Sequence, residues 1–389
     1  MYAEVAMPLK VMLIAGEASG DLHGGKLVAA LRGLEPELEL FGVGGDRMAA
    51  AGMELYYHVN DLAYIGFIEV ARHYLYFRRV FNRLIEVVKS RRPEVVVLID
   101  YPGFNLRFAK AVKKLGISTF YYIAPQVWAW GQGRAAKMAG FVDQMAVLFA
   151  FEVDFFSRYQ IKTTFVGHPL LEGMEVGLSR YEFMEKYDLN PGHPLLALIP
   201  GSRNQEVRHL LPPMLQTAEQ LRRNHPELQV AISQAASVEP QQFESLVAAA
   251  PWARAVRADY YPLMHYATAG MVASGTATLE AACADLPFAL LYRVSPLSFA
   301  IGKQLVKIPN IGLVNIVAGE AVVPEFLQDD LVPDQMAPVV ERLLFDEPAR
   351  SAMQVKLAGV RNRLGEAGAS QKTARLVLEQ IGLHQDETN

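Results

Sequence analysis

The chain of 389 residues has a single cysteine, Cys283, so it can form neither an internal disulfide nor a thiolate metal site. The neighbours of Cys283 are mostly apolar, which favours a small buried residue over a nucleophile. Metal-binding patterns are also missing, because the sequence has no H-E-x-x-H, no Asp-x-Asp and no histidine pair at ligand spacing. We expect a reducing compartment and neither metal nor cofactor.

Long hydrophobic runs are missing as well. No uncharged apolar stretch reaches the roughly 18–20 residues that span a bilayer, and Met1–Lys10 lacks the basic start and apolar core of a signal peptide. The net charge of -4 argues against a protein that coats nucleic acid. We therefore expect a cytoplasmic protein, with peripheral attachment to a membrane and homodimer formation left open.

Hydrophobic residues make up 51% and charged residues 20% of the chain, a globular composition whose length suits two domains. Short apolar runs alternate with helical patterns, which predicts an α/β fold of two Rossmann-like, doubly wound sheets facing each other across a cleft. The strands are expected at Lys10–Ala15, Leu38–Gly42, Val95–Asp100, Thr119–Ile123, Gln144–Phe149, Thr163–Val166, Pro194–Ile199, Leu228–Ser233, Ala255–Val256, Gly270–Ala273 and Phe288–Tyr292.

The alternation of apolar runs and helical patterns begins again after Val166, which predicts domains over residues 1–168 and 169–350. Residues 351–389 follow as a tail, in which Ser351–Gly382 is expected to be helical and could pack back across the hinge. Ligands of such sheets bind at the carboxyl ends of strands, so the functional residues are sought there.

The first strand is followed by a polar, glycine-containing turn that opens a helix. It carries Glu17, Ser19, Gly20 and Asp21, and the free N–H groups of such a turn favour an anion. The alternative is a simple capped turn. The G-x-G-x-x-G spacing of a dinucleotide site is absent here, and the partial match at Gly131–Ala136 does not follow a clean strand.

A carboxylate stands at the tip of the third predicted strand. Asp100 ends the apolar run that starts at Val95, and Pro102 and Gly103 then turn the chain into a helix near Asn105. A carboxylate in this position can act as a general base. The alternative is an aspartate that merely caps the next helix.

Two further strand ends in the second half suit a nucleotide diphosphate. Gly201 and Ser202 allow the backbone to approach a phosphate, and Arg203 offers a planar fork of donors. The other strand end leads into a helix whose first turn could hold a pyrophosphate and whose carboxylate could accept ribose hydroxyls. It carries Ser274, Gly275, Thr276 and Glu280.

The segment from Asp61 to Arg92 combines aromatic and basic residues, which suits the surface of an anionic bilayer or a groove for acyl chains. The alternative is a core helix with a solvated basic face. The residues concerned are Tyr64, Phe67, Arg72, Tyr74, Tyr76, Phe77, Arg78, Arg79, Phe81, Arg83, Lys89, Arg91 and Arg92.

Taken together, the motifs resemble those of the lipid-A-disaccharide synthase family. The matching segments run from Lys10 to about Gln328: Ala15–Asp21, Gly42–Gly45, Ile99–Asp100 with Phe104–Asn105, Ala124–Trp130, Val166–Leu170, Pro200–Arg203 with Glu206, Ser274–Glu280 and Ile308–Asn315.

This resemblance implies a GT-B fold and an inverting transfer of diacylglucosamine from UDP to diacylglucosamine 1-phosphate at the inner membrane surface of Gram-negative bacteria. The product would be a β-1,6-linked disaccharide 1-phosphate. With Asp100 as base, Asn315 is expected close to the donor, and Glu17, Ser19, Gly20, Asp21 and Asn105 on the acceptor side.

Three rival functions remain. A UDP-sugar 2-epimerase uses the same architecture but needs no lipid-facing surface, and a lipid-linked glycosyltransferase of cell-wall synthesis would differ in its acceptor. A non-catalytic sugar-nucleotide binder would leave Asp100 without a task. The roles of His168, Trp128 and Trp130 are undecided between packing and substrate contact.

Overall fold

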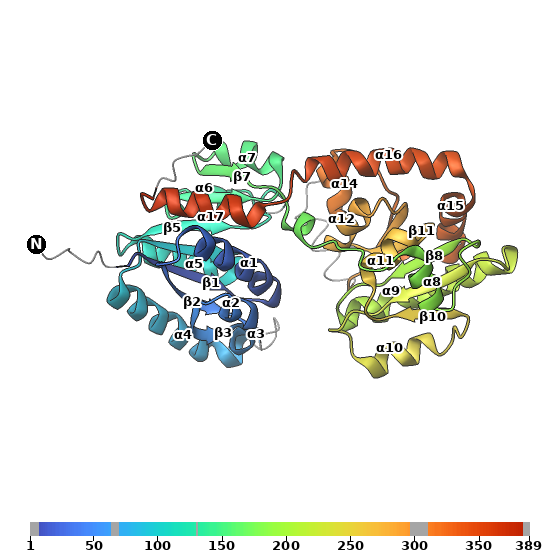
Figure 1. Ribbon diagram of the computed structural model, residues 1–389, viewed down its shortest axis with the longest axis horizontal. Helices are drawn as coiled ribbons and strands as arrows, with labels where there is room; N and C mark the ends of the chain where they lie inside the picture. The colour runs from blue at the N-terminus through green and yellow to red at the C-terminus, as the bar shows by residue number, and fades with distance from the viewer. Residues whose placement is uncertain (1–7, 64–69, 130, 296–309, 384–389) are drawn as a thin grey trace, which may run out of the picture. The chain divides into compact units, whose positions relative to one another are not determined.

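The computed structural model describes residues 8–63, 70–129, 131–295 and 310–383, and the chain divides into two units (Figure 1). The first unit comprises Met1–Glu172 and Gly365–Asn389, and the second comprises Gly173–Leu364. Each is built on one parallel sheet with helices on both faces. The predicted α/β class with two doubly wound domains is confirmed.

The sheet of the first unit has, within the described residues, the strand order β3-β2-β1-β4-β5-β6-β7. The strands β1, β4 and β5 are almost wholly buried, and β1 and β4 are almost wholly apolar, as expected for parallel strands covered by helices on both faces. The seven strands are β1 (Lys10–Ala15), β2 (Glu39–Gly44), β3 (Glu54–His58), β4 (Val95–Ile99), β5 (Ser118–Tyr122), β6 (Gln144–Val147) and β7 (Lys162–Phe165).

Two helical layers cover this sheet. On one face α1 packs along α17, and on the other α4 packs on α5. The helices of this unit are α1 (Ala18–Leu34), α2 (Asp46–Ala50), α3 (Val59–Ala63), α4 (Val70–Arg91), α5 (Pro102–Lys113), α6 (Gly133–Met138), α7 (Ala150–Ser157), the 3-10 helix η1 (Pro169–Glu172) and α17 (Ala369–Gln380).

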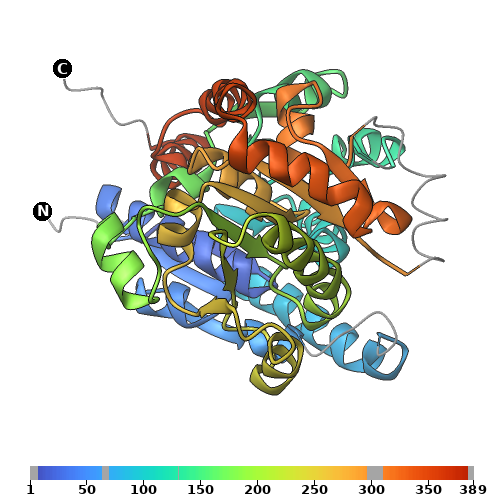
Figure 2. The ribbon, with the colours of Figure 1, turned by 90° about the vertical axis from the view of Figure 1, so that its right-hand side faces the viewer.

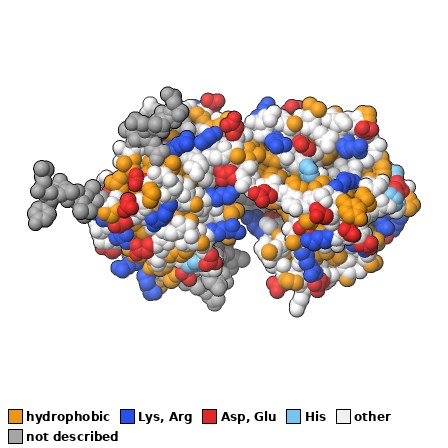
Figure 3. Space-filling view, in the orientation of Figure 1, with side chains coloured by type: hydrophobic (Ala, Val, Ile, Leu, Met, Phe, Trp, Pro, Cys, Tyr) orange, Lys and Arg blue, Asp and Glu red, His pale blue; other side chains and the backbone are white. Residues whose placement is uncertain are grey.

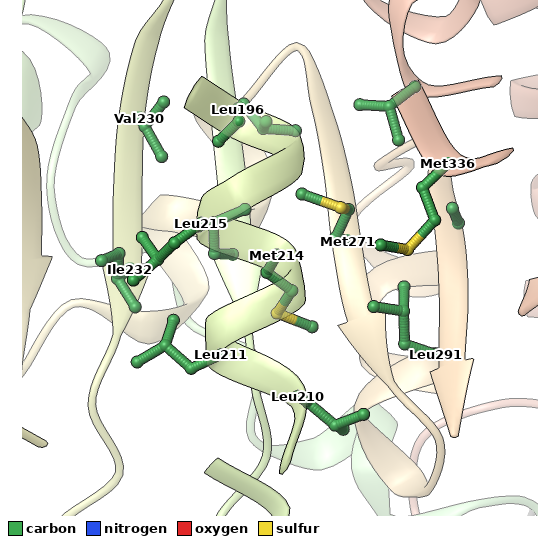
Figure 4. Close-up of a cluster of buried hydrophobic side chains, with 14 of the residues drawn as sticks. Leu196, Leu210, Leu211, Met214, Leu215, Val230, Ile232, Met271, Leu291 and Met336 are labelled. Carbon is green, nitrogen blue, oxygen red and sulfur yellow. The ribbon is translucent and has the colours of Figure 1, made fainter. Parts of the chain in front are cut away.

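The sheet of the second unit has the order β10-β9-β8-β11-β12-β13 within the described residues. Helix α9 lies across it with Leu211, Met214 and Leu215 directed at strand side chains such as Leu196 and Ile232 (Figure 4). The strands are β8 (Leu195–Ile199), β9 (Gln229–Ser233), β10 (Ala253–Val256), β11 (Ala269–Ala273), β12 (Phe288–Tyr292) and β13 (Glu325–Leu327).

Helices also flank the second sheet, as Figure 2 shows in a second view. Helix α16 packs against α12, α14 and α15. The helices are α8 (Arg180–Lys186), α9 (Asn204–Asn224), α10 (Pro240–Val247), α11 (Tyr260–Tyr266), α12 (Thr276–Cys283), α14 (Leu313–Ala318), the 3-10 helix η2 (Gln328–Asp330), α15 (Pro333–Phe345) and α16 (Glu347–Arg363).

The tail over Ser351–Gly382 is helical as predicted for most of its length, but it is broken once. The chain forms α16 and α17, separated by a turn in which Gly365 and Gly368 adopt positive φ angles of 83° and 102°. A side chain is strained in that conformation, so the glycines allow the helix to end. Helix α16 belongs to the second unit and α17 to the first.

Candidate active site

Asp100 lies where the strand order of the first sheet reverses. Strand β1 pairs with β2 on one side and with β4 on the other, and Ala15 stands opposite Ile99 at the carboxyl ends. Ligands of open α/β sheets bind at this switch point. The turn with Glu17 and the turn with Asp100 therefore occupy the same edge, as the sequence predicted for ligand-binding turns.

The backbone at Asp100 is unusual, because Asp100 and Tyr101 have positive φ angles of 45° and 46°. Such left-handed conformations cost roughly 1–2 kcal/mol for a residue with a side chain. The carbonyl oxygen of Asp100 is held by two side chains: the Tyr121 hydroxyl donates to it at 2.6 Å, and Asn105 Nδ2 donates at 2.8 Å. These bonds hold the backbone of the turn at Asp100, and Tyr101, not Asp100, occupies the N-cap position of α5.

The Asp100 carboxyl is a weaker acid than an exposed aspartate. Burial raises its pKa to about 6, and the neighbouring charge of Glu17 adds to this effect. The carboxylate is still the main form at neutral pH, and a base with a pKa near the working pH accepts a proton efficiently. Its electrostatics fit the role of general base.

Other residues of the predicted acceptor side have definite places. Ser19 and Glu17 are exposed, and Gly20 is buried close to Ala15. Asp21 is buried, and its carboxylate accepts three backbone N–H groups, from Gly45, Arg47 and Met48, at 2.6 to 3.1 Å. Asp21 thus anchors the start of α2, and a contact between Asp21 and a substrate stays a prediction.

Gly16 makes room for the turn at Asp100 and Tyr101. A Cβ atom at Gly16 would lie 2.1 Å from Cδ1 of Tyr101, so any side chain there would displace the tyrosine ring next to Asp100. The sequence offered one signal for this requirement, the glycine directly after a buried strand. It gave no signal for Tyr121, which comes to Asp100 from the adjacent strand.

Tyr121 offers a test of how this turn is held. We expect Tyr121→Phe to lower the free energy of unfolding by about 1–2 kcal/mol, because the Asp100 carbonyl loses one of its two side-chain donors. We also expect a lower kcat with unchanged affinity for UDP. Urea unfolding and steady-state kinetics would check this, and a variant equal to the parent in both would contradict the holding role.

The second unit repeats this geometry. Strand β8 stands between β9 and β11, and Val272 pairs with Ile199 near the carboxyl ends. The turn of Gly201, Ser202 and Arg203 and the turn of Ser274, Gly275 and Thr276 therefore lie side by side at the switch point. The structure brings together the two turns that the sequence assigned to the nucleotide.

Glu206, which the sequence motifs included without a role, organises the first of these turns. Its Oε2 accepts the N–H groups of Ser202 and Arg203 at 3.1 and 3.3 Å, and its Oε1 pairs with Arg203 at 3.0 Å. A Cβ atom on Gly201 would lie 2.3 Å from Glu206 Oε2, so glycine is required there. The Arg203 side chain is 81% exposed and accessible to an anion.

Helix α12 begins at Thr276 after Gly275, whose φ of 142° suits glycine. Glu280, one turn further, is held by two phenols: Tyr260 and Tyr261 donate to it at 2.8 and 3.1 Å. Burial raises the pKa of Glu280. The tyrosines were also missed, because they come from α11.

Asn315 is fully buried and uses all its hydrogen-bonding groups inside the second unit. Its Nδ2 donates to Val323 O and Glu325 Oε1, and its Oδ1 accepts the N–H groups of Val322 and Val323. The side chain fixes α14 to the segment before β13. A direct contact with the donor stays a prediction.

The undecided aromatic residues have structural partners. Trp128 is buried and donates to Glu152 Oε1 at 3.0 Å, and burial raises the pKa of Glu152 to about 7. His168 is buried beside Phe149, and burial, together with the charge of His23, lowers its pKa to about 4. These contacts favour packing; Trp130 lies outside the described residues.

The basic, aromatic segment divides into two kinds of residue. Tyr76, Phe77 and Phe81 pack against the core, whereas Arg78, Arg79 and Arg83 are exposed. Arg91 faces inward, because it pairs with Glu39 and Glu54 and stacks 4.2 Å above the Phe41 ring. Arg91 therefore does not contribute to a basic outer face as predicted. Tyr64 and Phe67 lie outside the described residues, as do the side chains of Arg72 and Tyr74.

Metal clusters and membrane-spanning helices are two further features that a site could depend on. In the described part of the chain, no three His, Cys, Asp or Glu side chains gather as metal ligands. Within the same residues, no helix has both the length and the apolar character to cross a bilayer.

Two doubly wound α/β units with polar turns at both switch points define a GT-B glycosyltransferase fold. Solved structures share it: a putative UDP-N-acetylglucosamine 2-epimerase from Listeria monocytogenes (TM-score 0.66, 12% identity, 97% of this chain and 98% of that one) and a calicheamicin glycosyltransferase (TM-score 0.62, 17% identity, 96% and 98%). At these identities the similarity shows the fold alone.

The sequence comparisons are closer. A family model described as lipid-A-disaccharide synthetase matches residues 11–378. The lipid-A-disaccharide synthases of Geobacter sulfurreducens and Coxiella burnetii (strain Dugway 5J108-111) are each 40% identical, over 96% and 94% of this chain and 97% of theirs. The chain belongs to the lipid-A-disaccharide synthase family and is a glycosyltransferase, as the motifs predicted.

Proposed function

We propose that this enzyme transfers 2,3-diacylglucosamine from UDP to the 6-hydroxyl of 2,3-diacylglucosamine 1-phosphate. The single observation that carries the proposal is Asp100, held at the switch point with a pKa raised to about 6 by burial and by Glu17. Membership of the family supports these substrates. Asp100, with its pKa raised by burial and by Glu17, explains how a hydroxyl can lose its proton and become a nucleophile.

In the proposed step Asp100 accepts the proton of the acceptor 6-hydroxyl. The hydroxyl oxygen attacks the anomeric carbon opposite the leaving group, a new C–O bond forms, and the bond to the UDP oxygen breaks with its electron pair. The α-linked donor gives a β-1,6-linked disaccharide 1-phosphate, so the anomeric centre is inverted. Asp100 later releases its proton to solvent.

The second unit would hold UDP. The exposed Arg203 guanidinium and the free N–H groups at the start of α12 can stabilise the charge that develops on the diphosphate. Glu280, fixed by two tyrosines, can accept hydrogen bonds from ribose hydroxyls. Asn315 would act indirectly, by fixing the α14 segment. No metal is required by this arrangement.

We further propose that the first unit contacts an anionic membrane surface. Arg78, Arg79 and Arg83 are exposed on α4, and cations near an anionic bilayer contribute to binding. This contact would place the enzyme where both acylated sugars reside.

The direct test is a product analysis. Purified protein in detergent is incubated with UDP-2,3-diacylglucosamine and 2,3-diacylglucosamine 1-phosphate, with a chelator present, and products are identified by mass spectrometry. We expect a disaccharide 1-phosphate and free UDP, and NMR of the new linkage should show the β anomer. An epimerised UDP-sugar without disaccharide would favour the epimerase, and an α linkage would overturn inversion.

The pH dependence of kcat/KM should report the Asp100 carboxyl. Because the base must be deprotonated, activity is expected to fall as the pH drops through about 6. Glu17→Gln removes a negative neighbour, which lowers the pKa of Asp100 and should move this acid limb to lower pH. An acid limb that stays in place or moves to higher pH would contradict the coupling of Glu17 to Asp100.

A further inference from the structure

A groove on the first unit, apart from the turns of the candidate active site, is lined by cations. It has a volume of about 790 Å³ and lies between α5 and α6. Six basic side chains line it, and no carboxylate is among the lining residues: Arg107, Lys110, Lys113, Lys114, Arg134 and Lys137. Apolar side chains of Leu106, Met138 and Phe141 complete the lining.

The helix pattern explains why these cations gather. Arg107, Lys110 and Lys114 recur at a spacing of three and four residues, so they share one side of α5 and its C-terminal end, while Phe108 and Val112 are buried on the opposite side. Arg134 and Lys137 are three residues apart, so they share one side of α6. All six are exposed.

So many like charges on one surface repel one another and create a positive local potential. Lys113 pairs with Asp143 across the end of α5. By contrast, basic and acidic side chains are interspersed over the face of the molecule drawn in Figure 3. A single-sign cluster in a protein of net charge -4 indicates an anionic ligand.

We propose that this groove binds the phosphate-bearing headgroup of an anionic phospholipid at the membrane surface. The inference rests on the membrane contact in the proposed function, and it names a surface for that contact. The groove is in the range of pockets that hold whole organic ligands, larger than a lone phosphate needs. Its apolar lining suits the glycerol and upper acyl region of a lipid, with the lysine stems lying along it.

The position of the groove supports a bilayer as the source of this headgroup. Helix α5 packs on α4 through Phe81. The centroid of the Phe81 ring lies 5.7 Å from that of Phe104 and 5.5 Å from that of Phe108. The groove therefore belongs to the same helical layer as the exposed arginines of α4. Phe141 is the one aromatic side chain in the lining, so the groove offers no series of stacking platforms for nucleic acid bases.

The test uses the full-length protein and vesicles of phosphatidylcholine with or without phosphatidylglycerol. The variant Lys110→Gln/Lys114→Gln is compared with Arg158→Gln/Lys162→Gln, which removes the same charge from exposed positions at the C-cap of α7 and the start of β7. A lysine at an anionic surface is worth roughly a fivefold change in binding, so the groove variant should bind anionic vesicles about 25-fold more weakly. The control should change little, and both should keep their turnover in detergent.

The outcomes separate the proposals. If the parent binds anionic vesicles and the groove variant binds them equally well, the proposal that the groove binds the headgroup is overturned, and the proposed membrane contact stands. If the parent ignores anionic vesicles but forms disaccharide in detergent, the membrane contact and the groove both fail while the transferase remains. If a short single-stranded DNA competes as strongly as lipid, and through the same lysines, the lipid assignment is overturned.

Discussion

Replacing Asp100 by Asn should lower kcat by roughly 10²- to 10⁴-fold, the usual contribution of a general base. The change removes the proton acceptor and keeps the shape of the side chain. Asparagine also tolerates the left-handed backbone that Asp100 adopts at a φ of 45°, so the turn should survive. UDP affinity should be unchanged, because the residues proposed to bind the nucleotide lie in the other unit.

Rates of UDP release and calorimetric titration with UDP would check both halves of this expectation. Asp154→Asn is a matched control, since it makes the same chemical change at an exposed position on α7. Near-normal turnover of Asp100→Asn would remove Asp100 from the proposed mechanism. Loss of UDP binding together with activity would indicate a structural defect instead.

Gly42→Ala should be among the most destabilising single substitutions in the first unit. Gly42 lies in β2 with a φ of 149°, and a Cβ atom there would lie 1.9 Å from the Leu13 carbonyl oxygen of β1. That oxygen is backbone in a buried strand and cannot move aside as a flexible side chain could. We expect a loss of about 4 kcal/mol or more in the free energy of unfolding.

Gly33→Ala is the matched control for this experiment. It adds the same methyl group inside α1, where no atom beyond the neighbouring residues and the local helix backbone lies within 4 Å of the new Cβ, and alanine favours helix over glycine by about 1 kcal/mol. Urea unfolding should therefore shift in opposite directions for the two variants. Equal midpoints for Gly42→Ala and the parent would contradict the close approach of β1 and β2.

The sequence predicted those parts of the fold in which a strand can be located from its own residues. The central strands β4 and β8 are apolar throughout and β1 is apolar after Lys10, so their location required no knowledge of their partners. Strand β3 was missed because Glu54–His58 is a half-buried edge strand with polar ends, and β13 because it has only three residues. Such strands are defined by their neighbours in the sheet.

The site was predictable to the same extent. Asp100, Gly201 and Ser274 follow apolar strands, so their place at a sheet edge could be expected. The residues that hold them could not, because Tyr121 is 21 residues from Asp100 and Tyr260 is 20 residues from Glu280. The inward turn of Arg91 depends likewise on Glu39, a partner 52 residues away.

The order of the units along the chain has a consequence for biosynthesis. Helix α17 packs along α1 and buries residues such as Ala374, Val377 and Leu378 in the first unit, although the whole second unit is translated before it. At about 5–20 residues per second, a ribosome takes on the order of 10 to 40 s to pass from the end of η1 to α17. During that interval the apolar face of α1 lacks its partner on every nascent chain. Folding of the first unit therefore finishes only after α17 has been translated, and we expect chaperones to bind that face until then.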